Sequence, residues 1–186
     1  MRIVKAQLHL RHVRFVGPTG VGKSTAVRSV SPVVTHLPAP ITVLGSPPRP
    51  STDLTDVGEW HTGNGAVVSL AAASGLAVPD LERLGALPRA GATVLWLYGD
   101  RRDSFTHARL WLERLFLLPE VRRLTVAITR LDQASVSCPS LSDYEALVSC
   151  FGSNVPVLAA DPRSARDVHD VLHVAMRGSF VTGLTA

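Results

Sequence analysis

The segment GPTGVGKS at residues 17–24 has the residue types and the spacing that bind nucleotide phosphates. Its glycines allow positive φ angles and close backbone approach, so that successive N–H groups and a helix N-terminus can surround a phosphate. Lys23 would bind the β- and γ-phosphates, and the hydroxyl of Ser24 would be a ligand of Mg²⁺. The segment therefore predicts a phosphate-binding loop, with Mg²⁺ as the cofactor.

A second segment, TRLD at residues 129–132, follows a buried apolar run, in the place where G-proteins carry N/T-K-x-D. The carboxylate of Asp132 can accept two hydrogen bonds from guanine, whereas adenine offers no matching pair of donors. Arg130 keeps the charge and the long stem of the usual lysine, and the stem can pack on a base. The segment favours GTP or GDP as the ligand; the alternative is an aspartate that only caps the following loop.

An earlier apolar run, at residues 94–98, supports a different nucleotide base. Residues 94–98 are apolar and are followed by Gly99 and Asp100, as in the strand-plus-aspartate element of ATPases. In that alternative Asp100 holds the water shell of Mg²⁺ and the base is adenine.

Six strands and about five helices are expected to position these segments. We expect strands at residues 12–16, 56–61, 66–71, 92–98, 124–129 and 155–160, and helices at 23–30, 79–87, 104–118, 142–151 and 164–178. The apolar runs 92–98 and 124–129 are typical of strands buried on both faces of a parallel sheet. Asn64 and Gly65 predict a tight turn in an antiparallel hairpin. Residues 31–50 contain six prolines and are expected to form a long functional loop. The pattern indicates an α/β fold.

Composition and charge restrict the possible functions further. The 186 residues fit a single domain, residues 1–186, and the net charge of +4 comes from arginines that form no long basic run. A nucleic-acid partner is therefore not expected. Without an 18-residue apolar stretch or a signal sequence, we expect a cytoplasmic protein with no membrane insertion. Cys138 and Cys150 are expected to be buried or inert thiols, and His169 and His173 to lie on a solvated helix surface rather than bind a metal.

The order of these segments resembles that of Ras-type small G-proteins, and specifically the bacterial MglA-like group that includes the conservon-type GTPases. Besides the loop and TRLD, the segment GDRRDSF at residues 99–105 is similar to the D-x-R-R-x-x-S-F of that group. The resemblance extends from about residue 10 to residue 177. It implies a P-loop NTPase of the Ras-like kind, with a six-stranded, mostly parallel sheet, one antiparallel edge hairpin, and helices on both faces. It also implies a regulatory role, with roadblock-type proteins as partners at the face formed by the hairpin and the long loop.

Three segments depart from the family. Residues 73–76 (ASGL) stand where the family has T-P-G-Q or D-x-x-G-Q: Gly75 could still reach a γ-phosphate, but Leu76 cannot orient the attacking water. Residues 161–163 (DPR) stand where the family has S-A-K or D-A-R, whose middle residue donates its N–H to guanine O6. Pro162 has no N–H, so this contact is lost unless the register shifts by one residue. The long loop leaves the Mg²⁺-binding threonine open, with Thr52 or Thr55 favoured.

Together these observations predict a guanine-nucleotide-binding regulatory protein that hydrolyses GTP slowly and acts through a partner protein. Two alternatives remain: a pseudo-GTPase interaction scaffold with weak or static nucleotide binding, and an ATP-binding P-loop NTPase. The expected ligands of Mg²⁺ are Ser24 and Thr52. The residues expected to contact the nucleotide are Gly17, Thr19, Gly20, Val21, Gly22, Lys23, Ser24, Thr25, Gly75, Thr129, Arg130, Asp132, Asp161, Pro162 and Arg163.

Overall fold

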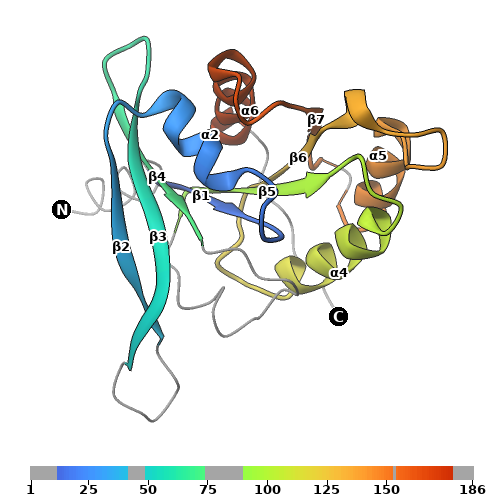
Figure 1. Ribbon diagram of the computed structural model, residues 1–186, viewed down its shortest axis with the longest axis horizontal. Helices are drawn as coiled ribbons and strands as arrows, with labels where there is room; N and C mark the ends of the chain where they lie inside the picture. Colours follow the sequence, from blue (N-terminus) through green and yellow to red (C-terminus); the bar gives the residue numbers. More distant parts are fainter. Residues whose placement is uncertain (1–11, 42–48, 74–89, 153, 178–186) are drawn as a thin grey trace.

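The computed structural model describes residues 12–41, 49–73, 90–152 and 154–177. Within these residues seven strands form one sheet in the order β2-β3-β4-β1-β5-β6-β7 (Figure 1). The strands are β1 (His12–Val16), β2 (Val34–Ile41), β3 (Arg49–His61), β4 (Val67–Ala72), β5 (Ala92–Tyr98), β6 (Leu124–Thr129) and β7 (Val157–Ala159). The helices are α2 (Lys23–Val30), α4 (Ser104–Phe116), α5 (Leu141–Ser149) and α6 (Ala165–Arg177), with a short 3-10 helix, η1 (Leu131–Gln133).

The sheet is mostly parallel, as expected. β4, β1, β5, β6 and β7 run parallel to one another, and β3 is antiparallel to both of its neighbours, β2 and β4. The hairpin expected around Asn64 joins β3 to β4, and its turn is closed by a 2.9 Å hydrogen bond from the Thr62 N–H to the Ala66 carbonyl. The α/β class and the hairpin are therefore confirmed.

The number of strands and the nature of residues 31–50 were predicted wrongly. Residues 34–41 form β2 instead of a loop, so the sheet has seven described strands, not six, and the β3–β4 hairpin is not at its edge. Prolines are tolerated in an edge strand because half of its backbone N–H groups need no strand partner. The pairing of β2 with β3 shifts register between Pro38 and Pro40, where these donors are missing.

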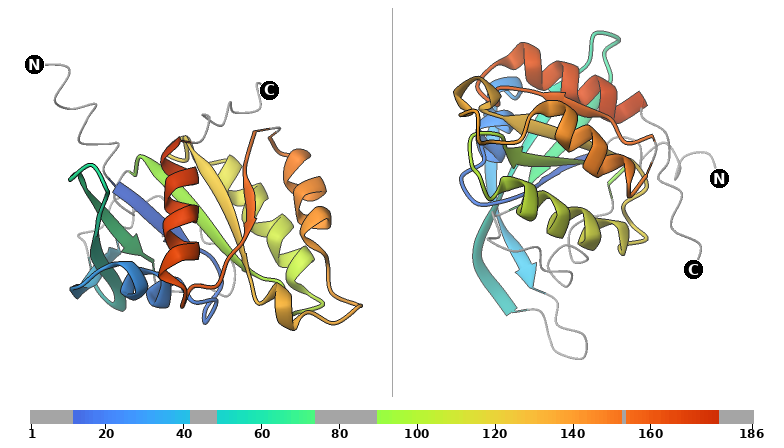
Figure 2. Two further views of the ribbon diagram at one scale, coloured as in Figure 1. Left: turned by 90° about the horizontal axis from the view of Figure 1, so that it is seen from above. Right: turned by 90° about the vertical axis from the view of Figure 1, so that its right-hand side faces the viewer.

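Helices cover both faces of the sheet (Figure 2). α2 and α6 pack on one face of the sheet, over a first cluster of buried apolar residues. α4 and α5 pack on the other face, over a second cluster. All seven residues of β5 are buried, because Val94 and Trp96 point to the first cluster and Leu95 and Leu97 to the second. The prediction of a strand buried on both faces is confirmed.

The helix expected at residues 104–118 corresponds to α4. Its buried apolar residues are Ala108, Trp111, Leu112 and Leu115. The helix expected at residues 79–87 lies outside the described residues. No helix in the described part of the chain is long and apolar enough to cross a membrane.

The two histidines of α6 pack against the sheet. The indole of Trp60 lies 4.9 Å from the imidazole of His173 and 6.0 Å from that of His169, measured between ring centroids. Trp60 is 3% exposed, so the histidines help to cover a buried indole of β3. Their spacing is explained by this packing.

Candidate nucleotide-binding site

The predicted phosphate-binding loop connects the end of β1 to the start of α2. Gly17 has a φ of +136°, and a Cβ atom there would lie 2.1 Å from the carbonyl oxygen of Trp96 in β5. Gly22 has a φ of +104° and is the N-cap of α2, so the helix begins at Lys23. The first N–H groups of a helix have no intrahelical acceptors, and the helix dipole adds positive potential there. The loop therefore has the backbone geometry of an anion-binding site.

Lys23 lies folded within this loop. Its ammonium group donates hydrogen bonds to the carbonyl oxygens of Gly17, at 2.8 Å, and Pro18, at 2.7 Å. The residue is 5% exposed, and burial lowers the pKa of Lys23 from the ordinary value of 10.5 to about 8. Lys23 therefore carries its charge at neutral pH, directly beside the loop backbone.

A cavity of about 540 Å³ brings three separate segments together: the end of the loop, the residues after β6, and the residues after β7. The carboxyl ends of parallel strands meet at one edge of a sheet, which is why segments over a hundred residues apart lie around one cavity. Nine of the predicted residues line it, namely Gly20, Val21, Gly22, Thr25, Arg130, Asp132, Asp161, Pro162 and Arg163. The structure thus assembles the predicted phosphate and base segments into one site.

Other cavity residues were not predicted. They are Ile128, Gln133, Ala159, Ala160 and Asp167, which flank the motifs in the sequence or lie in the first turn of α6. Conversely, Thr129 does not line the cavity; it is fully buried at the end of β6. Gly17, Thr19, Lys23 and Ser24 lie on the loop and the first turn of α2 rather than in the cavity wall.

Arg130 has an unusual backbone conformation for an arginine. Its φ is +56°, in the left-handed region, and it is followed by η1, which carries Asp132. Residues other than glycine adopt this region rarely and at a cost, often at functional sites. The Arg130 guanidinium lies 5.1 Å from the ring centroid of Tyr98, and 3.7 Å from a carboxylate oxygen of Asp100.

Tyr98, the last residue of β5, joins the segment after β6 to the loop between β1 and α2. Its hydroxyl donates a 2.7 Å hydrogen bond to the carbonyl oxygen of Thr19, while its ring lies under Arg130. Its own carbonyl accepts a 2.9 Å hydrogen bond from the hydroxyl of Tyr144 in α5. Tyr98 was predicted only as part of a buried strand. Its polar role depends on partners 79 and 46 residues away, for which the sequence has no local signal.

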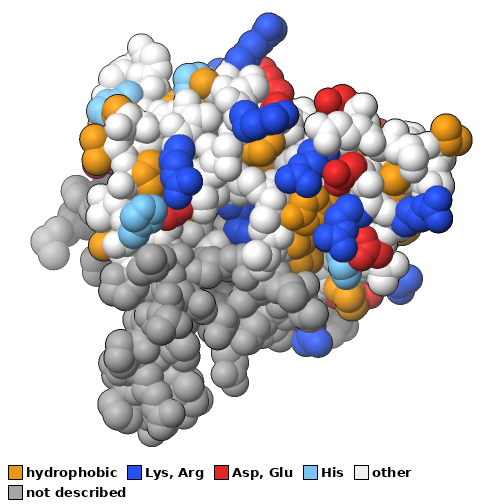
Figure 3. All heavy atoms as spheres, viewed as in Figure 1, with side chains coloured by type: hydrophobic (Ala, Val, Ile, Leu, Met, Phe, Trp, Pro, Cys, Tyr) orange, Lys and Arg blue, Asp and Glu red, His pale blue; other side chains and the backbone are white. Residues whose placement is uncertain are grey.

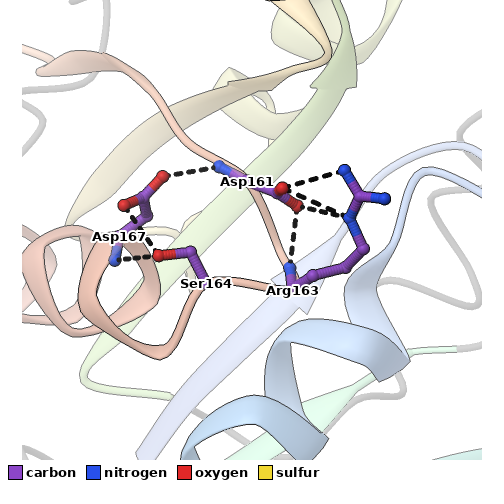
Figure 4. A network of polar contacts seen from close by, with 4 residues as sticks. All are labelled: Asp161, Arg163, Ser164 and Asp167. Carbon is purple, nitrogen blue, oxygen red and sulfur yellow. Dashed lines mark hydrogen bonds and ion pairs between the residues drawn. The ribbon is translucent and has the colours of Figure 1, made fainter.

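The segment after β7 is held by a network of polar contacts (Figure 4). The side chain of Arg163 donates from Nε and Nη2 to the carboxylate of Asp161, at 2.9 to 3.2 Å. The Arg163 hydrogen bonds lower the pKa of Asp161, whose carboxylate is accordingly ionised at neutral pH. Pro162 packs against the loop, since a Cβ atom at Gly22 would lie 2.5 Å from Pro162 Cγ. The segment is therefore both ordered and fitted to the phosphate loop.

Charges of both signs lie near the ends of β5, β6 and β7. Ion pairs there are Arg130 with Asp100, Arg101 with Asp103, and Arg163 with Asp161. On the face shown in Figure 3, positive and negative side chains lie next to one another over the described region.

Several predicted residues are not placed at the site. Gly75 and Leu76 lie outside the described residues. Thr52 lies within β3, and its side chain is outside the described part of the structure. Thr55 is also in β3, where it is 8% exposed and pairs with Leu37 of β2. The second Mg²⁺ ligand therefore stays a prediction.

No protein-family model matches the chain, and neither does any curated protein. Among solved structures, the chain is similar to the cytosolic domain of the FeoB iron transporter of T. maritima in its GMPPNP form, with a TM-score of 0.58 and 15% sequence identity. The similarity covers 89% of this chain and 62% of that chain, so this chain spans less than two thirds of its structural neighbour. At this identity the similarity establishes a shared fold, which agrees with the GTPase-like fold expected from the sequence.

Proposed function

We propose that the chain is a guanine-nucleotide-binding regulatory protein of the small-GTPase kind, which binds GTP or GDP with Mg²⁺. The observation that carries this proposal is the cavity that joins the phosphate loop to Asp132 and to residues 161–163. Its volume is in the range of small-molecule sites. The fold shared with a domain solved in a GMPPNP form supports the same conclusion.

The loop, the cavity and the first turn of α2 each have a role in this proposal. The loop and the N-terminus of α2 bind the phosphates, and Lys23 exchanges its two carbonyl partners for phosphate oxygens. Asp132 accepts hydrogen bonds from the N1–H and N2–H groups of guanine. Arg130, already fixed by Tyr98 and Asp100, borders the base.

The residues present fit a magnesium ion that is held mostly by phosphate oxygens and water. Among the described residues there is no group of three or more His, Cys, Asp or Glu side chains that could hold a metal ion. Mg²⁺ bound with a nucleotide needs only one or two protein oxygens, and Ser24, in the first turn of α2, supplies one. Thr52 is the second ligand that we propose. The ion would neutralise phosphate charge when bound.

Hydrolysis is proposed to be slow because Leu76 replaces the residue that orients water in the family. A partner protein would then complete the site, and we propose that this partner is a roadblock-type protein. The edge formed by β2 suits such a contact, since Val33 beside it is 71% exposed and Leu37 within it is 47% exposed. The MglA-like group is the proposed family.

Nucleotide analysis of the purified protein, followed by titration with fluorescent GDP and GTP, tests the proposal. We expect bound or tightly binding guanine nucleotide, and loss of binding in Lys23→Ala without unfolding of the domain. Asp132→Asn should shift the preference from GTP toward xanthosine triphosphate, because an amide presents a donor where guanine needs an acceptor. Asp170→Asn, an exposed change on α6, is the matched control and should behave like the unmodified protein.

The same experiment separates the alternatives. Equal competition by ATP and GTP would contradict the role of Asp132 and favour the ATP-binding alternative, with Asp100 near the metal. Failure of every nucleotide to bind would favour the interaction scaffold.

A further inference from the structure

Within residues 161–164, directly after β7, no backbone N–H is available for a purine base. The N–H of Asp161 donates to Asp167 Oδ2 at 3.0 Å, and the N–H of Arg163 donates to Asp161 Oδ1 at 2.9 Å. Pro162 lacks an N–H, and the N–H of Ser164 donates to the Asp161 carbonyl at 3.0 Å. A register shift by one residue therefore does not replace the contact that Pro162 removes, because both neighbouring N–H groups are already used.

This arrangement is anchored in α6 and is not a loose loop (Figure 4). The Ser164 hydroxyl donates to Asp167 Oδ1 at 2.9 Å, and the Asp167 N–H donates back to the Ser164 hydroxyl at 3.3 Å. The second oxygen of the same carboxylate holds the N–H of Asp161. To free the Asp161 N–H for a ligand, the contacts at the start of α6 would have to break, which makes an ordered side-chain donor the simpler source of a base contact.

Arg163 is the side-chain donor that this segment offers. An arginine has five N–H donors. The carboxylate of Asp161 accepts hydrogen bonds from Nε and Nη2 of Arg163. Among the described residues Nη1 has no hydrogen-bond partner, and Arg163 lines the cavity. The Arg163 side chain is 70% exposed, and its two-pronged contact with Asp161 favours one plane of the guanidinium while leaving the Nη1 donors for a ligand.

Arg163 and Asp132 both border the cavity, on the segments after β7 and β6. The pKa of Arg163 is raised by its hydrogen bond to Asp161 first, and the charge of Asp132 also contributes. The two side chains therefore place a donor and an acceptor on the same cavity. The edge of guanine presents the matching pattern, with the O6 acceptor beside the N1–H and N2–H donors, whereas adenine presents an amino group in place of O6.

We propose that the side chain of Arg163, held by Asp161, reads the O6 atom of guanine in place of the missing backbone donor. The proposal rests on the guanine-binding function proposed above and adds a specificity-determining residue to it.

Affinities for GDP, 6-thio-GDP and ADP, measured by competition against a fluorescent GDP, test the proposal. Sulfur is a weaker and larger acceptor than oxygen, so 6-thio-GDP keeps the N1–H and N2–H donors and is changed at position 6 alone. The unmodified protein should bind GDP about tenfold more tightly than 6-thio-GDP, the size of one charge-assisted hydrogen bond. Arg163→Ala should weaken GDP binding by about the same factor and remove the difference between the two nucleotides. Arg163→Lys, which keeps a charged donor, should retain part of the difference.

Arg166→Ala is the matched control, because it removes an exposed arginine that does not line the cavity. Equal binding of GDP and 6-thio-GDP by the unmodified protein would overturn the role of Arg163, and this measurement does not depend on the folding of a variant. A difference that persists unchanged in Arg163→Ala would also overturn it while leaving guanine binding intact. Absence of any GDP binding by the unmodified protein would instead refute the proposed function itself.

Discussion

The buried ammonium group of Lys23 should make the stability of the nucleotide-free protein depend on pH between about 8 and 10.5. Below pH 8 both the folded and the unfolded chain hold the proton, and the full cost of burying the charge is present. Between 8 and 10.5 the folded protein releases the proton first, because burial lowers the pKa of Lys23 to about 8. The unfolded chain then binds more protons, so the free energy of unfolding rises with pH. At about 1.4 kcal/mol per pKa unit, the rise attributable to Lys23 is roughly 3 kcal/mol.

Urea denaturation from pH 7 to pH 10.5 measures this effect, with Lys23→Met as the test variant, since methionine fills the space without a charge. The variant should lack the rise, while Ser24→Ala should retain it. Burial also raises the pKa of Tyr144, which acts in the opposite direction above pH 10 but is common to all three proteins. If the unmodified protein and Lys23→Met gain the same stability with increasing pH, Lys23 does not bury a charge in the loop.

Two further predictions concern the contacts that hold the loop. Tyr98→Phe removes the hydroxyl that donates to the Thr19 carbonyl and should lower the free energy of unfolding by about 1 kcal/mol. The variant should also release bound fluorescent GDP faster. An unchanged release rate would contradict a bridging role for Tyr98. Gly22→Ala should destabilise the protein more than Gly65→Ala, since both have positive φ but only Gly22 would clash, with Pro162 at 2.5 Å. Thermal or urea unfolding should show that the free energy of unfolding falls by about 1 to 2 kcal/mol in Gly65→Ala and by more in Gly22→Ala. Equal decreases would show that Pro162 can move away from the new Cβ atom without destabilising the protein.

The parts of the fold that follow from short-range patterns could be predicted from the sequence. The loop at residues 17–24, the turn at Asn64 and Gly65, and the strand at residues 92–98 lie where expected, because glycine conformation and side-chain alternation act within a few residues. The segment at residues 34–41 was predicted wrongly because its prolines disfavour a strand by local criteria. It is a strand because β3 continues beyond the hairpin and offers a pairing edge.

The sequence also predicted which segments would contact phosphate and base. It could not determine that one cavity joins them, which depends on the parallel order of β1, β5, β6 and β7. The tertiary structure alone decided that the Tyr98 hydroxyl donates a hydrogen bond to the Thr19 carbonyl, and that the carboxylate of Asp167 accepts one from the N–H of Asp161. The first of these contacts joins residues far apart in the chain, and the second depends on where α6 begins after β7. A hydrogen-bond partner is chosen by distance in space, and residue spacing alone does not contain that distance.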